Sequence, residues 1–363
     1  MPATSRLLRR LNAERVLDAV RDTGPLRVTE LVASTGLSRP TVDAVADDLI
    51  RLGWLEEIAA EARRGRPARS LAFRADAGYV AGLDIGEVKV RTAVADLRGE
   101  IVAERVREFA GADRLAVIRR TMRATMADAE VTRGHLLAAC AGCTGPMDPR
   151  TGHVLFSSIF EDDYDLAGAL EGTFGRRPVV ENDCNLAVIA EHWRTGLDDI
   201  VAVLAGERIG AGIMVGGQIL RGHSGAAGEL AYLGAIEPEE GAFGIAQFVR
   251  ELSGEAPEAV FAAAGAGDEN AQAIVARVER WAGSGIVMAA QIVNPEVVVI
   301  SGGVARAGEV LLAPLRARLE AMVRMPPRLE ASPLAERGPL VGAIRSALDD
   351  LEPRLLDALD EAA

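Results

Sequence analysis

Arg39 is the side chain whose type and place in this sequence best suit a defined chemistry. It lies in the segment Ser38-Arg39-Pro40-Thr41-Val42. Ser38 is a favourable N-cap and Pro40 is tolerated in a first helical turn, so the segment predicts the start of a helix. Side chains at the start of such a helix can reach base edges in the DNA major groove. An arginine there can donate two hydrogen bonds to guanine. We therefore predict that Arg39 contacts DNA, together with Ser38 and Thr41, which lie at the same end of the helix.

A second group of arginines lies in the segment Arg63-Arg64-Gly65-Arg66-Pro67. Two short strand-like segments, 54–57 and 70–73, flank it. An Arg-Pro pair in a narrow loop can enter an A·T-rich minor groove, where the potential is most negative. Arg64, Arg66 and Pro67 are therefore predicted to contact DNA. The alternative for an arginine run taken alone is a solvated loop.

Three helices are needed to position these two segments. Apolar residues near helical spacing predict a helix over 7–20, which Gly24-Pro25 ends. A second short helix ends at Gly36. The third helix has one apolar face, formed by Val42, Val45, Leu49 and Leu52. The order of turn, helix and basic wing predicts a winged helix-turn-helix domain over residues 1–75. The alternative is a generic three-helix bundle.

The charge of the chain is unevenly distributed. The 363 residues carry a net charge of −13, yet residues 1–75 hold 13 Arg against 10 Asp and Glu. The remainder therefore carries −16. A mildly basic head on an acidic body fits a protein whose nucleic-acid contact is confined to one small domain.

The composition predicts a globular cytoplasmic protein of two or three domains. Hydrophobic residues make up 49% of the chain, without any run of 18 apolar residues or a secretory signal at the N-terminus. Only three cysteines occur, and Cys140 and Cys143 form a single CxxC at the end of an apolar strand-like run. We interpret them as small buried residues, because a lone CxxC is a weak metal signal.

Strand-like and helical segments alternate from residue 80 onwards. The first cycle contains strands at 79–86, 88–96, from 101, and 136–143, with a helix over 113–130. A second cycle begins with strands at 200–204 and 210–215. Two related halves, about 80–195 and 196–345, predict an internally duplicated α/β fold with a cleft between its lobes, all within a domain over 76–363.

Four motifs in this region resemble those of the ROK family (repressors, open reading frames and sugar kinases). They are Asp84-Ile85-Gly86, Glu181-Asn182-Asp183-Cys184-Asn185, the segment from Gly222 to Glu229, and Asn294-Pro295 followed by Ile300-Ser301-Gly302-Gly303. The resemblance implies a two-lobed actin-like ATPase fold. It also implies that Asp183 matches the catalytic base and that Asn182 and Glu229 bind sugar. Without the resemblance, Glu181-Asn182-Asp183 is a helix N-terminus with capping carboxylates.

Both phosphate loops of the family pattern are altered in this chain. The usual Gly-Gly-Thr-Lys is Gly86-Glu87-Val88-Lys89, and the usual Gly-Thr-Gly-Ile-Gly is Gly206-Glu207-Arg208-Ile209-Gly210. Val88 offers no hydroxyl, while Glu87 and Glu207 place negative charge where phosphates would lie. Arg208 offsets part of that charge. We therefore expect neither ATP binding nor kinase activity, although Gly302-Gly303 of the adenosine side is retained.

The zinc site of the family is also altered. The position of the histidine that follows the Ala-Gly-Glu motif corresponds to Tyr232, and residues 233–244 form a short acidic segment without cysteine. Without thiolates or a histidine cluster we expect no structural zinc and no other cofactor. The loss of these partners weakens the expected sugar pocket of Asn182, Asp183 and Glu229.

The leading hypothesis is a DNA-binding transcriptional regulator, a repressor, whose kinase-like domain senses a sugar-type effector and mediates oligomerisation. A DNA-binding scaffold without a small-molecule ligand is one alternative, and an active ATP-dependent sugar kinase is another. The expected partners are a double-stranded DNA operator, a sugar or sugar derivative and a second copy of the chain. A homodimer or higher homo-oligomer is expected because one recognition helix makes a small contact and paired half-sites are the usual remedy.

Overall fold

The N-terminal part of the computed structural model is a winged helix-turn-helix, as predicted. The structure describes residues 3–58, 69–148, 150–230 and 244–357. The head consists of α1 (Ala3–Thr23), β1 (Leu26–Arg27), α2 (Val28–Thr35), α3 (Arg39–Arg51), β2 (Leu55–Ile58) and β3 (Ser70–Phe73). Its small antiparallel sheet has the order β1-β3-β2. Gly36, with a φ of 69°, ends α2, because a left-handed residue there satisfies the last carbonyls of the helix.

The first lobe is built on a five-stranded sheet of order β11-β7-β4-β5-β6. Its strands are β4 (Tyr79–Ile85), β5 (Lys89–Asp96), β6 (Ile101–Glu108), β7 (Leu136–Cys143) and β11 (Val179–Asn182), with a small sheet of β8 (Met147–Asp148), β9 (His153–Val154) and β10 (Tyr164–Asp165) beside it. Side chains alternate between the two faces of β4. Ala81, Leu83 and Ile85 share a core with α4 (Arg114–Asp128) and α5 (Leu166–Phe174), whereas Val80 faces a second core on the opposite side.

The second lobe repeats this topology, which confirms the predicted duplication. Its sheet has the order β14-β13-β12-β15-β16, with β12 antiparallel to β13 and parallel to β15, as β4 is antiparallel to β5 and parallel to β7. The strands are β12 (Ile200–Ala205), β13 (Ile209–Val215), β14 (Gln218–Ile219), β15 (Val297–Ser301) and β16 (Arg328–Ala331). The helices of this lobe are α7 (Ile245–Ser253), α8 (Pro257–Gly265), α9 (Glu269–Val293) and α10 (Glu309–Met322).

Two helices lie between the sheets and hold the halves together. These are α6 (Asp183–Thr195) and α11 (Gly338–Leu351), which pack closely against each other. A Cβ atom on Gly342 of α11 would overlap the backbone carbonyl of Leu186 in α6, so only glycine permits this approach. The helix α11 therefore packs within the large domain, against α6, β4 and β7.

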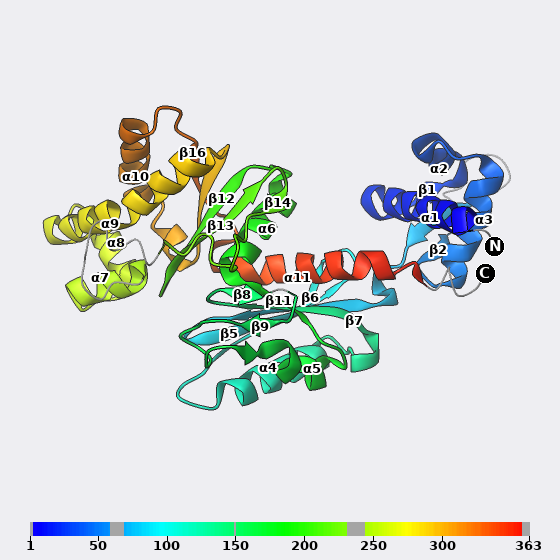
Figure 1. Ribbon diagram of the computed structural model, residues 1–363, viewed down its shortest axis with the longest axis horizontal. Helices are drawn as coiled ribbons and strands as arrows, with labels where there is room; N and C mark the ends of the chain where they lie inside the picture. Colours follow the sequence, from blue (N-terminus) through cyan, green and yellow to red (C-terminus); the bar gives the residue numbers. More distant parts are fainter. Residues whose placement is uncertain (1–2, 59–68, 149, 231–243, 358–363) are drawn as a thin grey trace.

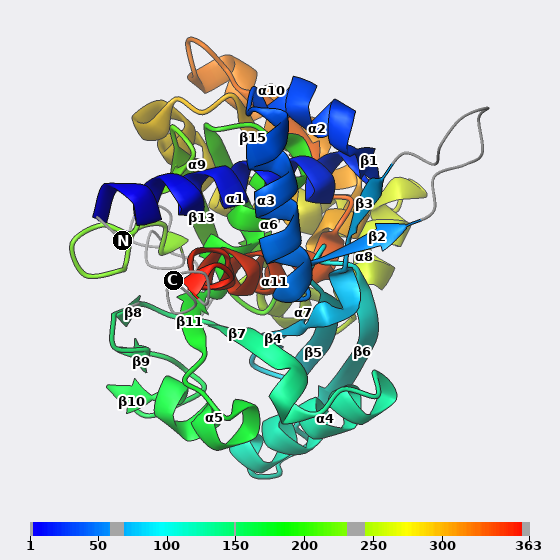
Figure 2. The ribbon, with the colours of Figure 1, turned by 90° about the vertical axis from the view of Figure 1, so that its right-hand side faces the viewer.

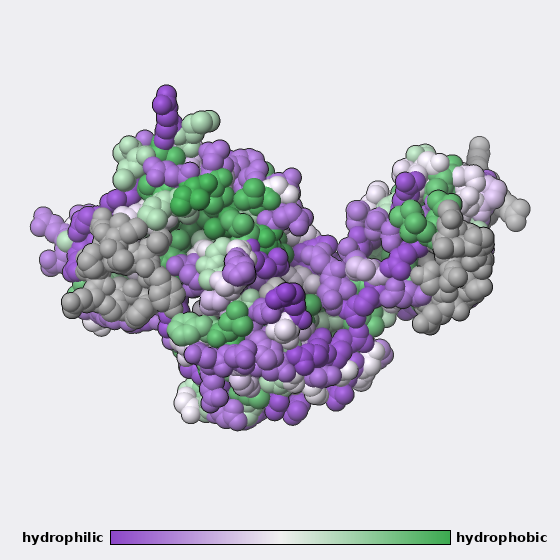
Figure 3. Space-filling model, viewed as in Figure 1, coloured by the Kyte–Doolittle hydropathy of each residue, from purple (hydrophilic) through white to green (hydrophobic). Residues whose placement is uncertain are grey.

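The end of the described chain packs against the head. Figure 1 shows α11 running from the body toward the head, and Figure 3 shows the narrow, mostly hydrophilic connection between the two parts. Leu355 and Leu356 are buried in the same cluster as Val16 and Leu49 of the head. The indole Nε1 of Trp54 donates a hydrogen bond to the carbonyl of Leu355 at 2.9 Å. We propose that the head comprises residues 1–75 together with this C-terminal segment, and the body the rest of residues 76–363.

None of the described helices is both long and apolar enough to cross a membrane.

Candidate functional site: an interlobe cleft and a recognition helix

A cavity of about 690 Å³ lies between the two lobes. Its lining includes the carboxyl groups of Asp84, Asp183 and Glu229 and the apolar side chains of Phe261 and Val304. The cleft expected between the duplicated halves is therefore present.

Asn182 and Asp183 reach this cavity at the junction of β11 and α6. The Asn182 side chain is the N-cap of α6, because its Oδ1 accepts hydrogen bonds from the amides of Cys184 at 2.8 Å and Asn185 at 3.1 Å. Its Nδ2 donates to the carbonyl of Gly145 at 3.0 Å. The segment is therefore a helix N-terminus, as the capping alternative stated, but its cap is the amide of Asn182 and not a carboxylate. Both side chains also line the cavity, so their role in sugar binding stays a proposal.

Arg221 holds the loop of Glu229 against the β11–α6 junction. Its guanidinium donates two hydrogen bonds, at 3.0 and 2.6 Å, to the buried carboxylate of Glu181. Glu181 also accepts from Asn185 Nδ2 at 2.9 Å. The two motifs that the sequence separates by some 40 residues are thus fixed beside one cavity.

The carboxyl groups at the base of the cavity are strongly perturbed. Burial, together with the charge of Asp183, raises the pKa of Asp84 to about 7, although the charges of Arg91 and Lys89 oppose the shift. Burial raises the pKa of Asp183 to about 6, although hydrogen bonds from Cys184 oppose the shift. Burial and the charge of Asp183 also raise the pKa of Glu229. Perturbed carboxyls gathered in a cleft mark a candidate ligand site.

Arg91 and Glu336 form part of the cavity wall that the sequence did not single out. The Arg91 guanidinium lies 3.9 Å from Asp84 and 3.4 Å from Glu336, and Arg306 pairs with the same glutamate. Arg91 is nearly buried in β5. Little in the local sequence marks Arg91, because β5 carries other polar residues and Glu336 lies 245 positions away.

The recognition helix α3 carries Ser38, Arg39 and Thr41 at its start, as predicted. Figures 1 and 2 show α3 on the side of the head that is turned away from the body. The Arg39 side chain is 69% exposed. Ser38 Oγ accepts from the Thr41 amide at 3.4 Å and lies 2.8 Å from Thr41 Oγ1, so the two hydroxyls form the cap. Arg64, Arg66 and Pro67 lie outside the described residues.

Two family models together match most of the chain. The ROK family model matches residues 80–244 and 242–347, and the IclR helix-turn-helix domain matches residues 11–58. The chain belongs to the ROK family. This confirms the resemblance drawn from the four sequence motifs and the actin-like fold that it implied.

Relatives of this ROK protein include repressors and kinases. The xylose repressor of Caldicellulosiruptor bescii is 22% identical over 95% of this chain and 97% of its own. The glucokinase of Thermotoga maritima is 32% identical over 56% of this chain and 76% of its own. A crystal structure of a ROK family transcriptional regulator, a homologue of the E. coli MLC protein, superposes with a TM-score of 0.77 at 20% identity, covering 96% of this chain and 99% of that chain. That last likeness shows the fold alone.

Both altered phosphate loops of this ROK protein face the cavity. Glu87 of the first loop pairs across the cleft with Arg208 of the second at 3.8 Å, and Glu207 pairs with Arg250 of α7. The Glu87 charge at the expected phosphate position is thus offset by Arg208, as the sequence suggested. Glu207 has a partner that the sequence did not indicate.

The glycine pair of the second lobe has a structural reason of its own. Gly302 has a φ of 85°, and a Cβ atom there would overlap the carbonyl of Ala205. Its retention therefore follows from chain packing as well as from any ligand.

The described ranges contain no group of three or more His, Cys, Asp or Glu placed to hold a metal ion. Tyr232 and residues 233–243, where the family zinc loop would be, lie outside the described residues. Cys140 and Cys143 are free and buried, as interpreted from the sequence, and Cys184 is free and buried as well.

Proposed function

We propose that this ROK protein is a DNA-binding transcriptional regulator, a repressor, whose interlobe cleft binds a sugar-type effector. The observation that carries the proposal is the joining of a helix-turn-helix head to a ROK body through α11. The xylose repressor aligns over 95% of this chain, whereas the Thermotoga maritima glucokinase aligns over 56%. The longer alignment with a repressor supports the proposal.

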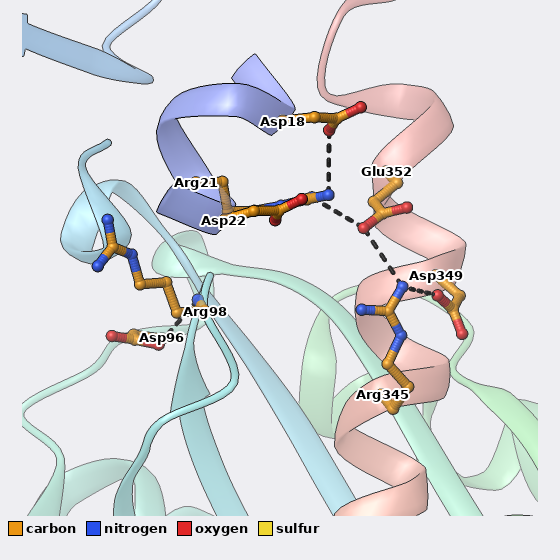
Figure 4. Close-up of polar contacts among 8 residues, drawn as sticks. All are labelled: Asp18, Arg21, Asp22, Asp96, Arg98, Arg345, Asp349 and Glu352. Atoms are coloured by element: carbon orange, nitrogen blue, oxygen red, sulfur yellow. Dashed lines mark hydrogen bonds and ion pairs between the residues drawn. The ribbon is translucent and has the colours of Figure 1, made fainter. Parts of the chain in front are cut away.

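The helix α11 extends from the cavity to the head. Glu336, just before it, and Pro339, in its first turn, line the cavity. Beyond its last turn, the carboxylate of Glu352 accepts a hydrogen bond at 2.8 Å from Arg21 of α1 (Figure 4). Glu352 also lies 3.4 Å from Arg345. A ligand that shifts α11 between the lobes would therefore reorient the head, provided that it binds the two arrangements with different affinities.

The effector site that we propose contains Asn182, Asp183 and Glu229. Carboxylates accept hydrogen bonds from sugar hydroxyls, and the amide of Asn182 has one N–H beyond the one that Gly145 accepts. A DNA-binding scaffold without a ligand is the second candidate. It is favoured by the ion pairs of Glu87 and Glu207, because these already fill part of the cleft with protein charge.

We further propose that kinase activity has been lost. The double variant Glu87→Gln/Glu207→Gln is expected to bind ATP roughly tenfold more tightly than the wild type, because two negative charges leave the phosphate positions and Arg208 and Arg250 keep theirs. Titration with a fluorescent ATP analogue measures this change. If the wild type binds ATP as tightly as the variant, the two glutamates do not hinder ATP binding. If the wild type phosphorylates a sugar, kinase activity has not been lost.

Arg39→Ala is expected to relax base preference at one position of each half-site, with roughly 1–3 kcal/mol of discrimination lost there. Duplexes selected from a random library by the wild type and by the variant measure this directly. Arg107→Ala is the matched control, because it removes the same charge from an exposed position of the body. The proposed function predicts a palindromic site for the wild type, recovered unchanged by the control. The absence of any enriched site would overturn the proposal, and so would an unchanged site with Arg39→Ala.

A further inference from the structure

Asp43 shares the outward face of α3 with Arg39 and Asp47. The three residues are spaced by four, which places them along one side of a helix. Their side chains are 69%, 41% and 62% exposed for Arg39, Asp43 and Asp47, respectively. The face of the helix that we expect to enter the groove therefore presents two carboxylates as well as a guanidinium.

The acidic residues of α3 differ in the groups that donate hydrogen bonds to their carboxylates. Asp48 is buried, and Arg9 and Arg51 donate hydrogen bonds to it. Asp47 accepts a hydrogen bond from Arg69 at 2.5 Å, and Glu57 accepts one from the same arginine at 3.0 Å. The Arg9–Asp48 contact joins α1 to α3, and the contacts of Arg69 join α3 to β2 at the base of the wing.

Asp43 has charged neighbours but no hydrogen-bond donor. Arg39 Nε and Arg69 Nη1 each lie 3.8 Å from its carboxylate, which is within ion-pair range. In the part of the chain that the structure describes, no group donates a hydrogen bond to Asp43. Its oxygens thus keep their accepting capacity, while two guanidinium groups offset the repulsion that a carboxylate would meet between DNA phosphates.

Among the bases, cytosine offers the donor that suits such a carboxylate. Cytosine presents its N4 amino group in the major groove without an adjacent acceptor. Adenine presents its N6 amino group beside the N7 acceptor, which repels a second carboxylate oxygen. Guanine and thymine present O6 and O4 and would repel the carboxylate.

We propose that Asp43 determines specificity by accepting a hydrogen bond from the N4 amino group of a cytosine in each half-site, next to the base that Arg39 reads. This inference rests on the proposed function. It makes an acidic side chain, rather than an arginine, responsible for one base of the operator.

Selection from a random duplex library by full-length wild type, Asp43→Ala and Asp43→Asn tests the proposal. The wild type is expected to favour cytosine at one position of each half-site by roughly tenfold or more over thymine. Asp43→Ala should lose that preference. Asp43→Asn should change it to adenine, because an asparagine amide pairs with adenine N6 and N7. Asp47→Asn is the matched control, since Asp47 binds Arg69, and it should keep the cytosine.

A modified base in the DNA provides a second test of the same contact. Replacing the selected cytosine by 2-pyrimidinone, which lacks the amino group, should weaken wild-type binding about as much as Asp43→Ala does. The same replacement should have no further effect on Asp43→Ala. If the wild type selects a site without the cytosine, the role of Asp43 is overturned. The same follows if Asp43→Ala and Asp43→Asn still select the cytosine. Either result leaves the proposed function intact. A wild type that enriches no site would overturn both.

Discussion

Replacing Gly342 by alanine is expected to destabilise the protein by about 3 kcal/mol, near the upper end of overpacking effects. The added methyl would meet the backbone carbonyl of Leu186, which cannot rotate away as a side chain can. Relief requires α11 and α6 to separate, and α11 is also the link to the head. Chemical denaturation of the full chain measures the free energy of unfolding.

Gly172→Ala is the matched control for this prediction. Gly172 also lies within a helix, α5, but a Cβ atom there meets nothing within 4 Å. Alanine has the higher helix propensity, so this variant should gain up to about 1 kcal/mol. If Gly342→Ala were as stable as Gly172→Ala, the close α6–α11 packing described above would be wrong.

Replacing Asp84 by asparagine is expected to stabilise the protein at alkaline pH by roughly 2–4 kcal/mol. Burial raises the pKa of Asp84 to about 7, from 3.8 in an unperturbed group. The folded state thus holds a proton that the unfolded state releases, and wild-type stability falls as the pH rises from about 4 to about 7. Asparagine mimics the protonated form and removes that loss.

The advantage of Asp84→Asn should therefore be small at pH 4, grow through this window and level off above pH 7. Denaturation curves for wild type and variant at several pH values measure it. Asp162→Asn, which removes the same charge from an exposed position, should show no such growth. A stability difference that does not depend on pH would mean that Asp84 ionises normally in the folded protein.

The sequence predicted those features that local patterns encode. The N-cap at Ser38, the turn at Gly36 and the apolar face of α3 were sufficient to predict the helix-turn-helix, and each is present in the fold. Alternating strands and helices likewise indicated the duplicated lobes, whose two sheets share one topology. Each of these signals lies within a few residues of the element that it specifies.

Contacts between distant segments could not be predicted in this way. The Trp54–Leu355 hydrogen bond joins residues 301 positions apart, and no local pattern marks either one. The Arg91–Glu336 and Glu207–Arg250 pairs likewise join segments that lie far apart in the sequence. The dual position of Asn182, as helix cap and as cavity wall, was left as two alternatives because the same short motif suits both.

Occupation of the cleft is expected to change the affinity of the head for DNA. The most direct test first screens neutral sugars for a rise in melting temperature. It then measures the affinity for the selected duplex with and without the sugar that gives the largest rise. The wild type should change by roughly 5- to 150-fold. The change should shrink in Arg21→Gln, which breaks the bond to Glu352, but not in Arg15→Gln from the same helix. A screen without any stabilising sugar, or a sugar that stabilises the protein without altering DNA affinity, would contradict this expectation.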